Sequence, residues 1–170
     1  DQVTTTTTWR WWSPPPPPRR WDPLAQSFTL DESRHVTSVD VFFHAVGSQD
    51  FTVQLRESDN GQPSMQTITQ VRVKNADIQA SGATRCTFPL PVYLNADQEY
   101  FLVFMSDDQT HALRVAELGK FDSVANQWVS SQPYTIGVLL SSSNASSWTV
   151  HNDMDLQFQL NVAEFTQSSL

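Results

Sequence analysis

The chain has 170 residues, of which 39% are hydrophobic, and its formal net charge at pH 7 is −8. This length suits one domain with some chain left over. No apolar run approaches the roughly 20 residues of a membrane-spanning helix, so we expect no membrane insertion. The single cysteine, Cys86, excludes an internal disulfide and a cysteine-rich metal site.

The first 21 residues have an unusual composition. Five threonines (4–8) precede a tryptophan cluster, and five prolines (14–18) then impose a polyproline II rod of roughly 16 Å. Four of the six tryptophans lie in this segment, although solvated linkers normally lack large aromatic residues. The start has no basic n-region or apolar h-region of a secretory signal, and we expect the sequence to be an excised or processed segment of a longer protein.

We therefore predict that residues 1–21 are an extended leader, or inter-subunit arm, that docks on protein. A stiff rod with amphipathic anchors suits a groove of another subunit, and Arg10 between two tryptophans permits cation–π stacking. Docking on its own domain stays open as the alternative. The candidate partner-binding residues are Trp9, Arg10, Trp11, Trp12, Pro14, Pro18, Arg19, Arg20 and Trp21.

From residue 22 onward, short apolar runs are separated by turn residues. The expected strands are 24–30, 36–46, 51–55, 69–73, 84–90, 99–105, 112–118, 134–140 and 156–162. Residues 51–55 alternate with a period of two, 99–105 suit a central strand buried on both faces, and Asn60-Gly61 marks the strongest turn. No segment keeps a 3.6-residue apolar period over three turns. The pattern predicts an all-β, antiparallel, jelly-roll-like β-sandwich over 22–170.

Charge is divided unevenly between these two parts. The leader carries one acidic and three basic side chains, a net of +2, and the remainder carries seventeen acidic and seven basic ones, a net of −10. An acidic body repels phosphate backbones, so we expect no nucleic-acid partner.

Motifs for catalysis or metal binding are sparse. The four histidines are dispersed, Cys86 fits a small buried thiol, and no nucleophile elbow is present. Two acidic pairs, Asp107-Asp108 and Asp153/Asp155, lie in polar segments, where we expect solvated carboxylates rather than a glycosidase pair. We predict no enzyme, no catalytic or metal residues and no cofactor. A structural Ca²⁺ held by loop oxygens is the open alternative, although no D-x-D-x-D-G loop supports it.

Two tryptophans outside the leader, Trp128 and Trp148, lie in polar loops. A flat aromatic ring beside polar groups can stack on a sugar, which would make these residues a ligand platform. The other interpretation, which we favour, is that each ring covers an open end of the sandwich.

Several segments together carry a resemblance to a known family. WDPLAQSF (21–28) is followed by VTSVDVFF (36–43), VQLRE (53–57) and NGQPS (60–64). This series resembles a domain of tail, baseplate and fibre-associated structural proteins of tailed bacteriophages. The match covers 21–64 well and the rest in general β character, and the Trp/Pro leader is not part of the pattern. Residues 94–100 are similar, more weakly, to carbohydrate-binding jelly rolls.

The resemblance implies a virion structural or assembly protein, made in the bacterial host cytoplasm. Its expected partners are other virion proteins, in a homo-oligomer or a large assembly. The alternative it leaves open is a carbohydrate-binding host-attachment module that contacts a surface glycan through the loop tryptophans.

Overall fold

A computed structural model describes residues 6–10, 23–117, 121–122, 127–128, 134–144, 147–152 and 154–163. For 6–10, 116–117, 121–122 and 127–128 it describes the backbone alone. Within this part of the chain no helix is long and apolar enough to cross a membrane.

The described residues are almost entirely strands and their connections. The strands are β1 (Thr6–Arg10), β2 (Leu24–Leu30), β3 (Arg34–Ala45), β4 (Phe51–Asp59), β5 (Gln62–Val73), β6 (Ala83–Leu94), β7 (Glu99–Met105), β8 (Ala112–Glu117), β9 (Phe121–Asp122), β10 (Gln127–Trp128), β11 (Tyr134–Ser141), β12 (Thr149–His151), β13 (Met154–Leu156) and β14 (Phe158–Ala163). One short 3₁₀ helix, η1 (Asn75–Asp77), follows β5. The predicted strands are present, several of them longer than expected. The predicted strand 156–162 is divided at Gln157 into the end of β13, which pairs with β8, and β14, which pairs with β3.

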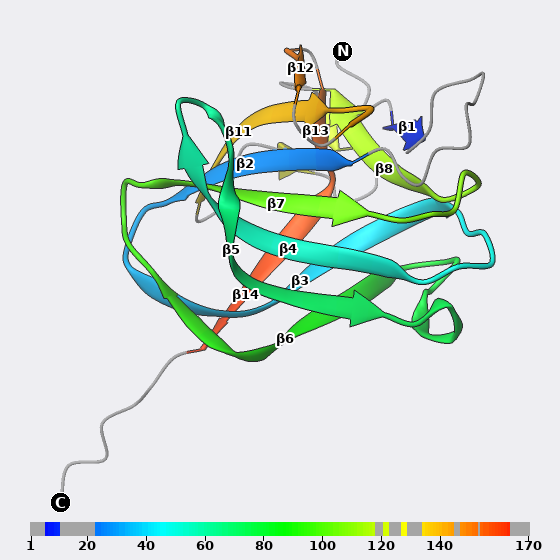
Figure 1. The fold of residues 1–170 in the computed structure, drawn as a ribbon, viewed down its shortest axis with the longest axis horizontal. Helices are drawn as coiled ribbons and strands as arrows, with labels where there is room; N and C mark the ends of the chain where they lie inside the picture. The colour runs from blue at the N-terminus through cyan, green and yellow to red at the C-terminus, as the bar shows by residue number, and fades with distance from the viewer. Residues whose placement is uncertain are drawn as a thin grey trace, which may run out of the picture.

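Two antiparallel sheets pack against each other, so the predicted β-sandwich is confirmed (Figure 1). The front sheet has the order β12-β11-β2-β7-β4-β5. In the back sheet, β3 pairs with β6, β14 and β8, and β8 also pairs with β13 and β1. β9 and β10 pair with each other separately.

The chain passes from one sheet to the other at most connections. β2 and β3 lie in different sheets, as do β5 and β6, and β6, β7 and β8 alternate between the sheets. An exception is the β4–β5 hairpin, whose turn places Asn60 at φ 53° and Gly61 at φ 78°. Both values lie in the left-handed region that Asn-Gly tolerates, which confirms the predicted turn.

The main core lies between the two sheets. β4 sends Phe51, Val53 and Leu55 into it, as the alternation predicted. Its largest fully buried members include Phe28, Phe43 and Phe104.

A second, smaller cluster lies on the outer face of the front sheet. It contains Ala25, Phe101, Val103 and Leu140, and partly buried Trp148 packs against it. β7, between β2 and β4, contributes to both clusters because its side chains alternate. The prediction that 99–105 is a central strand buried on both faces is therefore confirmed.

Candidate functional site

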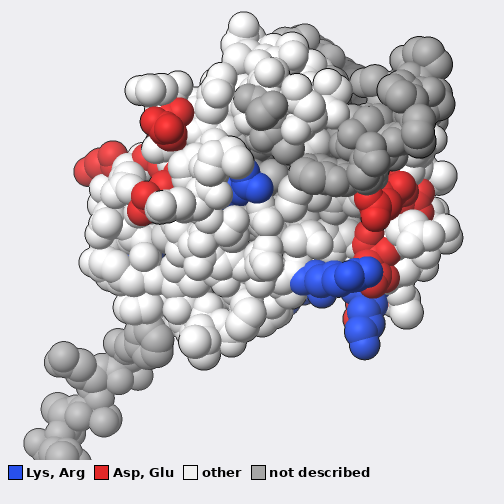
Figure 2. All heavy atoms as spheres, in the orientation of Figure 1, with Lys and Arg blue, Asp and Glu red and all other residues white. Residues whose placement is uncertain are grey.

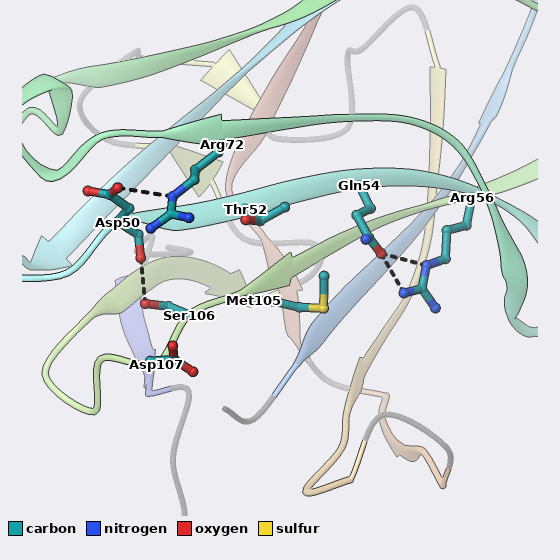
Figure 3. Close-up of a pocket in the computed structure, with 8 residues that line it drawn as sticks. All are labelled: Asp50, Thr52, Gln54, Arg56, Arg72, Met105, Ser106 and Asp107. Atoms are coloured by element: carbon teal, nitrogen blue, oxygen red, sulfur yellow. Dashed lines mark hydrogen bonds and ion pairs between the residues drawn. The ribbon is translucent and has the colours of Figure 1, made fainter. Parts of the chain in front are cut away.

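A shallow groove of about 370 Å³ lies on the outer face of the front sheet (Figure 3). Strand alternation builds it: because Phe51, Val53 and Leu55 point inward, the intervening side chains of β4 point outward. The lining residues are Asp50, Thr52, Gln54, Arg56, Arg72, Met105, Ser106 and Asp107. The lining is thus mostly polar and carries charges of both signs.

Arg56 lies at one end of the groove and is only 8% exposed. Its Nε donates to Gln54 Oε1 at 2.8 Å, its Nη2 donates to the same oxygen, and its Nη1 donates to the Ser64 carbonyl at 3.3 Å. All these acceptors are neutral, and burial lowers the pKa of Arg56. Among the described residues no carboxylate pairs with this guanidinium.

The other end of the groove holds an ion pair. Arg72 Nε donates to Asp50 Oδ2 at 3.0 Å, and the Asn75 backbone N–H donates to Asp50 Oδ1 at 2.7 Å. The Asn75 N–H, with a smaller contribution from Arg72, holds the pKa of Asp50 below its ordinary value. Arg72 therefore has an acidic partner, whereas Arg56 has none in the part of the chain that the structure describes.

Asp108, which is 8% exposed, holds the loop that connects β3 to β4. Its carboxylate accepts hydrogen bonds from the backbone N–H groups of Ser48, Gln49 and Thr110. Burial alone raises the pKa of Asp108, but these donors and His111 outweigh it, so the pKa is lowered. Gly47 lies so close that an added Cβ would be 2.2 Å from this carboxylate.

His111, fully buried, completes this polar network. Its Nδ1 accepts from the Gly47 N–H at 3.0 Å, which leaves Nε2 as the donor to the Gln49 carbonyl at 2.6 Å. The expectation of a solvated Asp107-Asp108 pair holds for Asp107, which is exposed. It was wrong for Asp108, because two loops distant in sequence enclose that carboxylate.

Of the second acidic pair, Asp153/Asp155, the structure describes only Asp155. Asp153 lies outside the described residues. Asp155 is buried, accepts from Gln26 Nε2 at 3.2 Å, and its Oδ2 has no hydrogen-bond partner among the described residues. Burial raises the pKa of Asp155 to about 6. It does not line the groove.

The raised pKa of Asp155 predicts that the stability of the fold depends on pH. The folded state binds this proton more tightly than the unfolded chain, so stability falls as the pH rises from about 4 to about 6. Asp155→Asn should therefore raise the free energy of unfolding at pH 7 by about 1–3 kcal/mol, with the gain vanishing below about pH 4. Urea titrations at several pH values test this, with the exposed Asp59→Asn as control. A gain that does not depend on pH would contradict the explanation.

The sequence-predicted site residues are only partly described. Trp9 and Arg10 belong to β1, of which the backbone alone is described. The remaining arm candidates, Trp11, Trp12, Pro14, Pro18, Arg19, Arg20 and Trp21, lie outside the described residues.

Of the two loop tryptophans, Trp128 and Trp148, only Trp148 has a described side chain. Trp128 is in β10, and its side chain is not described. Trp148 is partly buried and packs against the outer-face cluster of the front sheet, so the interpretation that it covers an open end of the sandwich stays a prediction. Cys86 is fully buried, which raises the pKa of its thiol to about 12, as expected for an inert cysteine.

Comparisons with protein-family models, curated proteins and solved structures gave no match to this chain. Among the described residues, no three His, Cys, Asp or Glu side chains are grouped so that they could hold a metal ion. Two features of the described chain can contact another molecule: the groove, and the edge of β8 along which β1 pairs.

Proposed function

We propose that this chain is a non-enzymatic structural module of a bacteriophage tail, baseplate or fibre, which docks on neighbouring subunits through its arm, residues 1–21. It would be made in the host cytoplasm and function in the virion. The observation that carries the proposal is β1, an added strand along β8 in which Thr6–Arg10 pair antiparallel with Ala112–Ala116.

Strand addition gives the arm a physical way to dock. In strand addition the affinity comes from main-chain hydrogen bonds, which depend little on the identity of the side chains. The β8 edge can therefore accept residues 6–10 of its own chain or of a neighbour. The five prolines at 14–18 limit the entropy that the arm loses on docking. The tryptophans around them supply large apolar area for burial in a partner.

A chain shortened to begin at Asp22 should keep the sandwich but lose assembly. The same loss is expected in the full chain after alanine replaces Trp9, Trp11, Trp12 and Trp21, because this variant keeps the arm's backbone but not its anchors. Light scattering across a concentration series measures the assembly, and circular dichroism checks the fold. If both variants assemble like the full chain, the arm is not the docking element.

The groove favours a second candidate, a carbohydrate-binding module for host attachment. Its outward hydroxyl, amide and carboxylate groups offer donors and acceptors that could serve a sugar's hydroxyls. On this view the groove, rather than Trp128 and Trp148, supplies the main contacts. Trp148→Ala should then leave glycan binding unchanged. A folded Trp148→Ala variant that loses binding would show instead that this tryptophan contacts the glycan.

A further inference from the structure

Arg56 is a buried cation surrounded by neutral acceptors. Burying a charge is expensive unless the charge is paired and hydrogen-bonded. Its hydrogen bonds go to one amide oxygen and one backbone carbonyl, and the ion pair at the other end of the groove involves Arg72 instead. The guanidinium therefore retains an unmet preference for an anion.

Gln54 occupies the position that a carboxylate would take on Arg56. Two nitrogens of the guanidinium, Nε and Nη2, converge on the single oxygen Gln54 Oε1 (Figure 3). This edge of arginine is the one that binds a carboxylate through two parallel hydrogen bonds. Gln54 Nε2 meanwhile donates to Gln70 Oε1 at 2.8 Å, so Gln54 has a second partner when its oxygen is displaced.

The rest of the groove suits a polyhydroxylated ligand better than a protein surface. From Thr52 to Arg56 the outward side chains of β4 span about 13 Å, enough for two to three sugar rings. Met105 supplies an apolar contact, and Asp107 and Thr52 offer oxygens to hydroxyl groups. Seven of the eight described lining residues are polar or charged, whereas the cores of protein interfaces are poor in charged groups.

The groove carries two basic and two acidic side chains. Figure 2 shows one small group of basic atoms near the middle of the face, with acidic atoms to its left, and further basic atoms that lie beside acidic atoms on the right. The acidic residues of the groove, Asp50 and Asp107, lie at the end opposite Arg56 (Figure 3), so a ligand carboxylate at Arg56 is separated from them.

We propose that the groove binds an oligosaccharide that bears a carboxylate, and that this carboxylate displaces Gln54 Oε1 from the Arg56 guanidinium. The proposal rests on the second candidate function and names its substrate class: uronate- or sialate-containing glycans. The sugar hydroxyls are then bound along Thr52 and toward Asp107.

The test measures binding by calorimetry to trigalacturonate and sialyllactose, each compared with its methyl ester, which keeps the hydroxyls but removes the charge. At least one acid should bind the full chain tenfold or more tightly than its ester. Arg56→Gln should remove this preference. Gln54→Glu should do the same, because it places a permanent carboxylate on the guanidinium, and its unfolding temperature should match or exceed that of the original chain.

Arg34→Gln is the matched control, because Arg34 is also an arginine but pairs with exposed Glu32 and does not line the groove; it should change affinity less than threefold. Equal binding of acids and esters would overturn the role of Arg56 while supporting a neutral-glycan module. No binding of any saccharide would overturn both glycan proposals, and the arm's role would be unaffected. Tighter binding of a glutamate-rich peptide than of every saccharide would overturn the ligand class and indicate a protein partner.

Discussion

Replacing Phe104 by alanine is expected to lower the free energy of unfolding by about 3–5 kcal/mol. Phe104 is fully buried at the centre of the front sheet, where β7 pairs it with Leu24 on one side and Val53 on the other. Its ring reaches the core between the two sheets, and close-packed neighbours cannot collapse into the space it would leave. Urea denaturation measures the change in the free energy of unfolding. The m-value, the dependence of this free energy on urea concentration, should stay constant.

Two further substitutions define what this result means. Phe101→Ala removes an equally buried ring from the same strand, but from the outer-face cluster, and should also lower stability by more than 2 kcal/mol. Met65→Ala, at a side chain that is 83% exposed, should stay within about 0.5 kcal/mol. A loss of less than about 1 kcal/mol for Phe104→Ala would show that the two sheets are not tightly packed together.

The strands were predictable because their signals are local. The alternation of 51–55 specifies which side chains point inward, whatever lies across the core, and the unbroken apolar run of 99–105 requires burial on both faces. Segment 24–30 alternates poorly, and the structure gives the reason. Gln26 is buried and bonded to the Val138 carbonyl and the Leu156 N–H, so a polar residue takes a core position by satisfying distant backbone groups.

The candidate site was less predictable because it depends on distant neighbours. Arg56 follows the outward phase of β4, which suggests a solvated cation, yet its side chain is buried. Its guanidinium is bonded to Gln54 of the same strand and to the Ser64 carbonyl of the neighbouring strand β5. No local pattern reveals that. Asp108 does carry one local signal: its carboxylate accepts from the N–H two residues later, at Thr110, as loop aspartates often do.

Asp108→Asn should lower the free energy of unfolding at pH 7 by about 2–4 kcal/mol. The carboxylate receives two N–H donors on Oδ2 and the Thr110 N–H on Oδ1. An amide keeps one acceptor oxygen and turns its NH₂ group toward at least one donor, which leaves a buried N–H unsatisfied. The loops that Asp108 joins, 46–50 and 106–111, also support one end of the groove, so the variant should weaken saccharide binding as well.

The same substitution should change how stability responds to acid. Because the pKa of Asp108 is lowered on folding, its contribution is complete above the unfolded value of about 4 and is lost as the pH falls through the folded value. The original chain should therefore lose stability below about pH 4 more steeply than Asp108→Asn. Asp107→Asn, at the exposed neighbouring residue, serves as control and should stay within about 0.5 kcal/mol. Parallel acid profiles for the original chain and Asp108→Asn would show that these backbone donors do not stabilise the charged carboxylate, and that the loop is held by His111 and packing instead.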